Sequence, residues 1–135
     1  MKVVIDTNCF LSMIGKTSIY RKVFDGFLEN KFVLCVSPEI LFEYEEKFNK
    51  FWGDEVTHNL MGVLLTADNT QLQSVYYNFN LVSSDADDNK FSDTYLASSA
   101  DLLVTHDKAL LALNKNEFPS IRAITLQDFL DSHLS

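Results

Sequence analysis

Two acidic residues, Asp6 and Asp107, each follow a short run of apolar residues that is typical of a buried strand. The first run covers residues 2–5 and the second covers residues 102–105. The carboxyl ends of parallel strands meet at one edge of a sheet, and the ligands of open α/β sheets bind beyond that edge. If these two strands are parallel, both carboxylates lie at the same edge, where together they could bind a cation.

Two further acidic residues could reach the same edge. Asp88 stands at the start of a predicted helix over residues 88–100, and Glu43 lies about two turns into another predicted helix. Glu43 has aromatic neighbours in the sequence, and a carboxylate is costly to bury unless a partner compensates its charge. Asp93 is a candidate fifth member of the group, although five residues after Asp88 it falls on a different face of a helix.

Several carboxylates gathered within a few ångströms repel one another. Each pair ~4 Å apart costs roughly 4 kcal/mol at an effective dielectric constant of about 20. Protonation with raised pKa values, or a hard divalent cation with oxygen ligands, can offset this repulsion. Because no His or Cys residue stands at ligand spacing, Mg²⁺ or Mn²⁺ is the expected cation. Such an ion can bind phosphate oxygens and activate water, so the acidic residues predict phosphodiester hydrolysis.

Each acidic residue also has an ordinary structural alternative. The tripeptide Asp6-Thr7-Asn8 could form a turn in which the side chain of Asp6 bonds the backbone ahead of it. Asp88 and Asp107 could cap the helices that follow them, and Glu43 could be a solvated helix residue. Only the coincidence of these residues at strand ends favours a common site over four separate structural roles.

The elements that would position these side chains alternate between strands and helices. Helix start signals are clearest at Ser37-Pro38, where Ser can cap the helix and Pro suits its first turn. Predicted strands cover residues 2–5, 32–36, 102–105 and 122–125. Predicted helices cover residues 18–29, 38–52, 54–67, 69–79, 88–100, 108–113 and 126–133. This order indicates an α/β fold, with a central parallel sheet and helices on both faces.

Length and composition favour one domain over residues 1–135, with 47% hydrophobic and 22% charged residues. The longest apolar runs are far shorter than a membrane span or a signal peptide needs, so a cytoplasmic protein without a membrane segment is expected. Cys9 and Cys35 lie in apolar sequence without metal-ligand spacing, which predicts buried free thiols.

The net charge of −8 argues against a broad electrostatic grip on nucleic acid. A nucleic-acid substrate would therefore need a metal ion and a small rim of basic residues. Candidates for that rim are Lys16, Arg21, Lys22, Lys47, Lys50 and Lys90.

Three segments together resemble the PIN domain family, specifically its VapC-like branch of toxins from toxin–antitoxin pairs. They are "VVIDTN", "VSPEILFEYEEKF" and "DADDNKFSDTYLASSADLLVTHDKALL". The resemblance covers nearly the whole chain in order and spacing. It implies a three-layer α/β/α sandwich around a central parallel sheet, forming a single PIN-like nuclease domain. It also implies a Mg²⁺- or Mn²⁺-dependent endoribonuclease, a cognate antitoxin as a protein partner, and a homodimer.

Carried over by position, the resemblance makes Asp6, Glu43, Asp88 and Asp107 the catalytic metal ligands. Asp93 stands where this branch often has Glu, and it is a candidate ligand of a second metal ion. Asn8 and Thr105 match polar positions that support the site in relatives, by orienting an acid or a metal-bound water. These seven assignments are what the resemblance implies for this chain.

The sequence departs from the family pattern at His106, where a small residue is usual. His106 could donate to phosphate or take part in proton transfer, or it could be a tolerated loop substitution. Two other functions remain open at this stage. One is a non-catalytic PIN-fold module that docks a basic peptide. The other is a phosphoryl-transfer fold, which is disfavoured because Asn8 stands where a D-x-D motif needs its second Asp.

Overall fold

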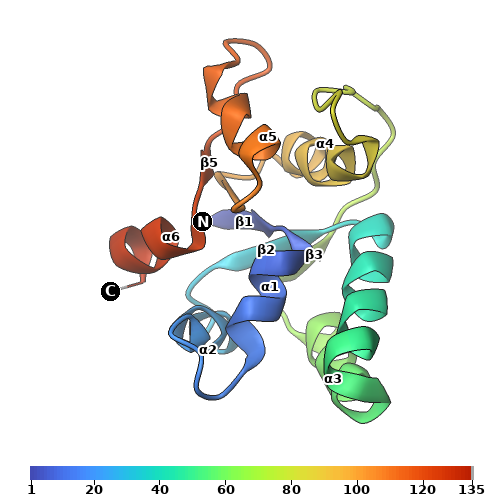
Figure 1. Ribbon diagram of the computed structural model, residues 1–135, viewed down its shortest axis with the longest axis vertical. Helices are drawn as coiled ribbons and strands as arrows, with labels where there is room; N and C mark the ends of the chain where they lie inside the picture. The colour runs from blue at the N-terminus through green and yellow to red at the C-terminus, as the bar shows by residue number, and fades with distance from the viewer. Residues whose placement is uncertain (135) are drawn as a thin grey trace.

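Five short strands form one parallel sheet at the centre of the computed structural model, which describes residues 1–134 (Figure 1). The strands are β1 Lys2–Ile5, β2 Val33–Val36, β3 Thr70–Leu72, β4 Leu102–Val104 and β5 Ala123–Ile124. Their spatial order is β3-β2-β1-β4-β5, and every neighbouring pair is parallel. Residues 3–5 of the central strand β1 have no exposed surface, as expected for a strand covered on both faces.

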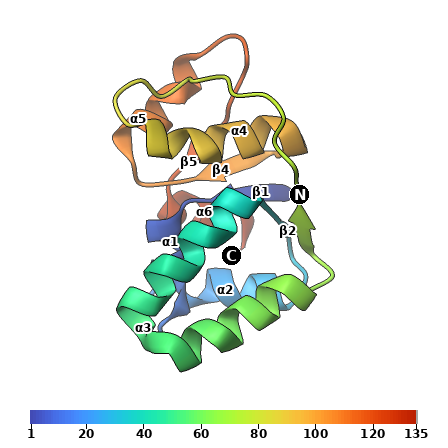
Figure 2. The ribbon, with the colours of Figure 1, turned by 90° about the vertical axis from the view of Figure 1, so that its right-hand side faces the viewer.

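Helices cover both faces of this sheet (Figures 1 and 2). The first three helices lie on one side, and α4 and α5 lie on the other. The α-helices are α1 Thr7–Ile14, α2 Arg21–Leu28, α3 Pro38–Thr66, α4 Asn89–Ser98, α5 Lys108–Leu111 and α6 Leu126–His133, and the 3-10 helices are η1 Ala86–Asp88 and η2 Ala112–Lys115. The predicted three-layer α/β/α sandwich with a central parallel sheet is confirmed.

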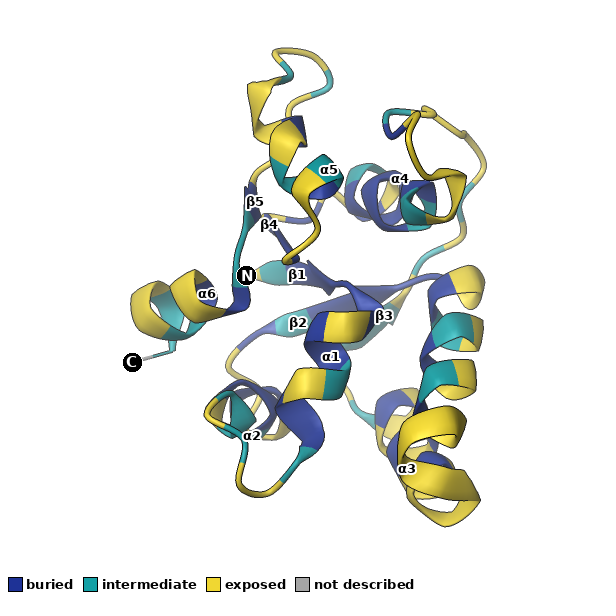
Figure 3. Cartoon of the chain, viewed as in Figure 1, coloured by how far each residue is buried: buried dark blue, intermediate teal, exposed yellow. Residues whose placement is uncertain are grey.

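The core lies between the sheet and the inner faces of the helices, which are buried while the outer faces are exposed (Figure 3). Between α1 and α3 an aromatic cluster holds Phe10, Tyr44 and Phe48, with ring centroids 4.8 to 5.7 Å apart. None of the three has more than negligible exposed surface, so α3 is fixed firmly against α1 and β1.

The two free cysteines lie in this core, as predicted. Burial raises the pKa of both thiols, so neither is a thiolate nucleophile at neutral pH. No helix within residues 1–134 is long and apolar enough to cross a membrane.

Local sequence explains the start and the bend of α3. The Ser37 side chain accepts a hydrogen bond of 3.3 Å from the Ile40 N–H, and Pro38 occupies the first turn, as predicted. The two helices predicted over 38–52 and 54–67 are two halves of α3, which bends at Gly53. The backbone φ of Gly53 is +82°, a value that L residues rarely adopt but glycine adopts freely.

The sequence prediction missed α1. Residues 6–8 were expected to form a turn, but Asp6 caps a helix that begins at Thr7. The Asp6 Oδ1 atom accepts a 2.8 Å hydrogen bond from the Cys9 N–H. A side-chain bond from Asp to the backbone just ahead is common to Asx turns and to helix caps, so the local signal could not separate the two.

The helix predicted over residues 69–79 is wrong. Thr70–Leu72 instead form β3, which pairs in parallel with β2, and the chain from residue 73 to 82 has no regular structure. The Gln73 N–H continues the ladder by donating to the Val36 carbonyl at 2.8 Å. The Val and Tyr residues of this segment favour extended backbone, and sheet pairing prevailed over the helical spacing of its aromatic residues.

Candidate functional site

An acid-lined cavity of about 190 Å³ opens at the carboxyl edge of the sheet, and we refer to it as the acid cavity. It holds four of the five predicted acids, contributed by the ends of β1 and β4, by α3 and by the start of α4. The lining residues are Asp6, Thr7, Asn8, Glu43, Lys47, Asp85, Asp87, Asp88, Phe91 and Asp107. Parallel strands therefore bring together acidic residues that are about 100 positions apart in the sequence.

Asp6 is held in place by three contacts although its surroundings are acidic. Its backbone N–H donates to the Val104 carbonyl at 3.0 Å, which extends the pairing of β1 with β4 by one residue. Its Oδ1 atom caps α1, and its Oδ2 atom accepts a hydrogen bond from the Thr105 hydroxyl. The carboxyl group is almost fully buried, with 6% of the residue exposed.

Thr105 links two of the acids. Its hydroxyl donates to Asp6 and also accepts a 3.0 Å hydrogen bond from the Asp107 backbone N–H. Asp107 in turn caps α5, because its Oδ1 atom accepts from the Ala109 and Leu110 N–H groups at 2.9 and 3.1 Å. One fully buried hydroxyl thus fixes the spacing of the two strand ends.

Glu43 reaches the acid cavity from α3. Its Oε2 atom accepts a hydrogen bond from the Thr7 hydroxyl, and its Oε1 atom lies 2.7 Å from the Lys90 ammonium. The neighbouring residue Tyr44 donates its phenolic hydroxyl to the Ile5 carbonyl, immediately before Asp6. This buried bond sets the position of Glu43 relative to the end of β1.

Asp88 has the most unusual carboxyl group in the acid cavity. Its Oδ2 atom is buried and has no hydrogen-bond partner among the described residues. Burial, and next the negative charges of Asp107 and Asp85, raise the pKa of Asp88 from 3.8 to about 6. A carboxylate oxygen without a partner, beside other carboxylates, is a group that a cation would stabilise.

Two predicted site residues lie differently from expectation. Asp93 lines a separate cavity of about 220 Å³, its Oδ1 atom accepts a 3.0 Å bond from the Phe79 N–H, and burial raises its pKa. A place for Asp93 beside the other four acids is therefore not supported, because the turn of α4 directs it elsewhere. Asn8 does line the acid cavity, but no hydrogen bond joins its side chain to Asp6 within residues 1–134.

Sequence reasoning missed two contacts of Glu43. Thr7 was hidden because α1 was not foreseen, and Lys90 was considered only as part of a phosphate-facing rim. The acidic run "DADD" also supplies more carboxylates than the single residue singled out from it, since Asp85 and Asp87 line the acid cavity too. The acidic run was the sequence feature from which Asp85 and Asp87 could have been predicted.

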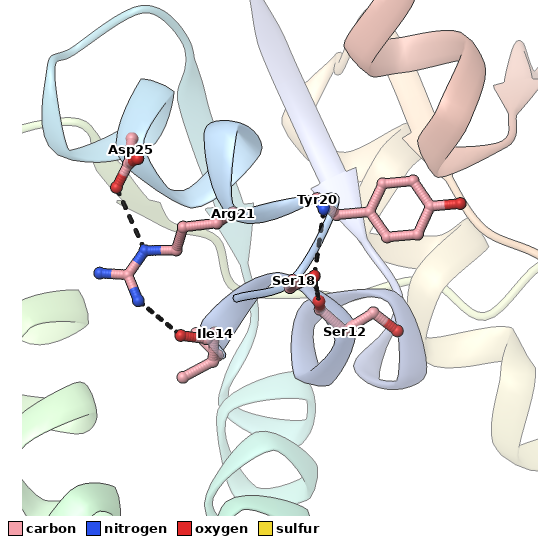
Figure 4. Close-up of polar contacts among 6 residues, drawn as sticks. All are labelled: Ser12, Ile14, Ser18, Tyr20, Arg21 and Asp25. Atoms are coloured by element: carbon pink, nitrogen blue, oxygen red, sulfur yellow. Dashed lines mark hydrogen bonds and ion pairs between the residues drawn. The ribbon is translucent and has the colours of Figure 1, made fainter. Parts of the chain in front are cut away.

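Arg21, a candidate for the basic rim, and His106, a candidate for phosphate binding or proton transfer, both make contacts that hold elements of the fold together. Arg21 donates to the Ile14 carbonyl at 2.6 Å and pairs with Asp25 at 3.2 Å, so it joins α1 to α2 instead of forming part of a rim (Figure 4). The Nε2 atom of His106 accepts a 3.2 Å hydrogen bond from the Leu126 N–H at the start of α6. This contact favours the structural alternative for His106.

The acid cavity suits a hard divalent cation in its chemistry. It offers carboxylate oxygens, and the buried Asp88 Oδ2 atom has no partner. Within residues 1–134, however, no three His, Cys, Asp or Glu side chains stand close enough to hold an ion as they are placed. Both Glu43 oxygens have partners within the chain, one in the Thr7 hydroxyl and the other in the Lys90 ammonium.

Known proteins resemble this chain in sequence and in fold. The chain is 36% identical to an uncharacterized protein of Methanocaldococcus jannaschii over 135 aligned positions, covering 94% of this chain and 84% of that protein. Its fold is similar to a chain in the crystal structure of VapBC2 from Rickettsia felis bound to a promoter DNA fragment, with a TM-score of 0.62, 16% identity, and coverage of 93% and 98% of the two chains.

A second solved structure, the T. brucei RRP44 PIN domain, aligns with a TM-score of 0.49 and 14% identity, over 96% of this chain and 78% of that one. The model of the PIN domain family matches residues 2–109, which include the four acids of the cavity. PIN domains are generally nucleases. The chain belongs to the PIN domain family.

Proposed function

We propose that this protein is a Mg²⁺- or Mn²⁺-dependent endoribonuclease that acts at the acid cavity. The observation that carries the proposal is the convergence of Asp6, Glu43, Asp88 and Asp107 at the carboxyl edge of the sheet. The buried, unpartnered oxygen of Asp88 and its raised pKa near 6 support a cation as the missing partner. These four carboxylates would hold the ion, which when bound would supply Lewis-acid activation of water and of the phosphodiester.

The chain's own residues would supply position and charge. The contacts of Asp6 with Cys9 and Thr105 keep its carboxylate fixed, so little reorganisation accompanies substrate binding. Asn8 would support the site as an exposed amide at the mouth of the acid cavity. Lys47 lies in the same lining and would contact a phosphate of the RNA backbone.

The likeness of the fold to a chain of the VapBC2 complex supports a further step. We propose that the protein is the toxin of a toxin–antitoxin pair, with a cognate antitoxin as partner and a homodimer as its assembly. A basic side chain of the antitoxin could enter the acid cavity, because the cavity is lined by carboxylates and the chain has a net charge of −8.

The experiment that tests the proposal is cleavage of a mixed RNA pool with Mn²⁺ present. The wild type is compared with Asp6→Asn, which keeps an oxygen to cap α1 but removes the charge. The matched control is Asp68→Asn, which removes one exposed carboxylate that does not line the acid cavity. We expect cleavage by the wild type and by the control, and at least a ~100-fold slower rate for Asp6→Asn. Equal rates for all three would refute the nuclease.

A second candidate is a non-catalytic PIN-fold module that docks a basic peptide. It is favoured by one observation, the Lys90 ammonium that already lies 2.7 Å from Glu43, which shows that a basic side chain fits there. The two functions separate in the same assay, because a docking module would bind a Lys- and Arg-rich peptide but leave the RNA pool intact with Mn²⁺ present.

A further inference from the structure

The ion pair between Lys90 and Glu43 joins the two helical layers beside the acid cavity, which Glu43 lines. Lys90 belongs to the first turn of α4 and Glu43 to α3, which lie on opposite faces of the sheet. The two charged atoms are 2.7 Å apart, and only 13% and 22% of the two side chains are exposed. A pair this short and this shielded is stronger than an ordinary surface salt bridge.

Lys90 and a divalent cation require the same oxygen atoms. The Oε2 atom of Glu43 accepts from Thr7 and its Oε1 atom from Lys90, and the positive charge of an ammonium 2.7 Å from Oε1 repels a divalent cation on the same carboxylate. An ion bound by Glu43 would therefore have to displace the ammonium.

An open groove lies next to Lys90 and can receive its displaced ammonium group. Besides contacting Glu43, Lys90 lines a groove of about 370 Å³ shared with Glu39, Phe42, Glu46 and Asp87, and it lines the Asp93 cavity as well. Glu43 and Asp87 line both this groove and the acid cavity, so the two hollows adjoin at the Lys90–Glu43 pair. A lysine side chain has a flexible stem and a compact charge, so it can turn outward and bind a phosphate oxygen.

We infer that Lys90 is an exchangeable counterion of the acid cavity. It neutralises Glu43 while no divalent ion is bound, and when the ion enters, it leaves Glu43 and binds the RNA backbone beside the cleavage site. Lys90 is thus a positioning residue with two successive partners, first a carboxylate and then a phosphate. This inference rests on the proposed nuclease function of the same site.

The test is calorimetric titration of the metal-free protein with Mn²⁺. Lys90→Met removes the competing charge, and we expect Mn²⁺ to bind it about tenfold more tightly than the wild type. Lys90→Arg keeps the charge and should stay within about threefold of the wild type. The matched control, Lys115→Met, removes an exposed charge that does not line the acid cavity, and it should change the affinity less than about threefold.

A second readout separates exchange from a merely structural role. At saturating Mn²⁺, Lys90→Met should raise KM for RNA about fivefold, because it cannot bind phosphate, while kcat changes less. Tighter metal binding together with weaker substrate binding is the combination that exchange predicts. If Lys90→Met does not fold, Lys90→Gln keeps a donor for Glu43 and carries the same expectations for Mn²⁺ and KM.

The outcomes distinguish this inference from the proposed function. Unchanged or weaker Mn²⁺ binding by Lys90→Met, or an equal gain in Lys115→Met, overturns the counterion role while the metal site stands. A wild type that binds no Mn²⁺ overturns both. Tighter binding with unchanged KM overturns the transfer of Lys90 to the RNA backbone.

Discussion

At the scale of single residues, the acidic cluster combines fixed carboxylates with one that is poorly compensated. Asp6 is held by backbone and hydroxyl donors, whereas the buried oxygen of Asp88 has no partner in the described chain. Asp6 and Asp107 were predictable because each follows a strand, and parallel strands end at one edge. Thr7 and Lys90 were not, because their partner Glu43 is 36 and 47 positions away in the sequence.

The pKa of Asp88 leads to a prediction for the metal-free protein. Between 3.8, its ordinary value, and about 6, the folded state retains a proton that the unfolded state has released, so the free energy of unfolding falls as pH rises through this window. Above about pH 6 this fall in the free energy of unfolding is complete. Asp88→Asn carries no charge at this position and does not undergo the fall. Thermal melts in EDTA at pH 7.5 should therefore give this variant a midpoint a few °C higher than the wild type.

The same comparison at pH 4 provides the control. There the carboxyl group of Asp88 is largely protonated in the folded state, so the two midpoints should nearly coincide. A wild type with a higher melting midpoint than Asp88→Asn at pH 7.5 without metal would show that the charged carboxylate of Asp88 does not destabilise the fold.

At the scale of elements, four of the five strands and the longest helix were predictable, but β3 and α1 were not. Hydrophobic runs and the Ser37-Pro38 start marked β1, β2, β4 and α3. The segment at 70–72 became a strand only because β2 was there to pair with it, and no local pattern contains that information. The start of α1 was ambiguous because an Asp side chain accepts hydrogen bonds from the backbone that follows it in turns and in helix caps alike.

The Tyr44 hydroxyl should matter for both stability and position. Tyr44→Phe removes the donor to the Ile5 carbonyl and leaves that buried oxygen unsatisfied, at a cost of about 1–2 kcal/mol in the free energy of unfolding. Urea denaturation measures this loss. Since the ring stays in the aromatic cluster, Phe10→Leu, which disturbs packing instead, serves as the comparison. An unchanged free energy of unfolding in Tyr44→Phe would show that the bond does not hold α3 to β1.

The bend of α3 allows a matched pair of glycine substitutions. No atom lies within 4 Å of a Cβ built at either Gly53 or Gly62, so contacts do not distinguish them. Gly53 has a φ of +82°, and Ala there should lower the free energy of unfolding by about 1 kcal/mol. Gly62 lies inside the helix, and Ala there should raise it by about 0.5–1 kcal/mol. Equal effects of the same sign, measured by urea denaturation, would contradict the role of the bend.

At the scale of the whole molecule, acidic residues outnumber basic ones by 19 to 11. The net charge is −8, and within the described chain Lys47 is the basic residue of the cavity lining while Lys90 pairs with Glu43, one of the lining acids. The sandwich itself, with its likeness to the VapBC2 chain at 16% identity, shows how little of the sequence the fold requires. The sequence predicted the architecture well. It did not predict which carboxylate oxygens have partners in the chain, because that depends on the side-chain conformations in the folded protein.

RNA binding should accordingly be weak and should depend on salt. If Lys47 and Lys90 make two phosphate contacts, raising salt from about 50 to about 200 mM should lower the affinity for single-stranded RNA roughly sevenfold. Fluorescence anisotropy with a labelled RNA and Ca²⁺ in place of Mn²⁺ measures this slope. A tight complex that is insensitive to salt would point to a different binding surface.

The most direct test of the central claim is whether the acid cavity binds a divalent cation. Calorimetric titration of the metal-free wild type with Mn²⁺ at pH 7.5 should show binding, and Asp6→Asn should weaken it by at least about tenfold. Asp68→Asn should bind Mn²⁺ as the wild type does. If the wild type binds no Mn²⁺, or if Asp6→Asn binds it equally well, the acidic residues do not form a metal site and the proposed nuclease is contradicted.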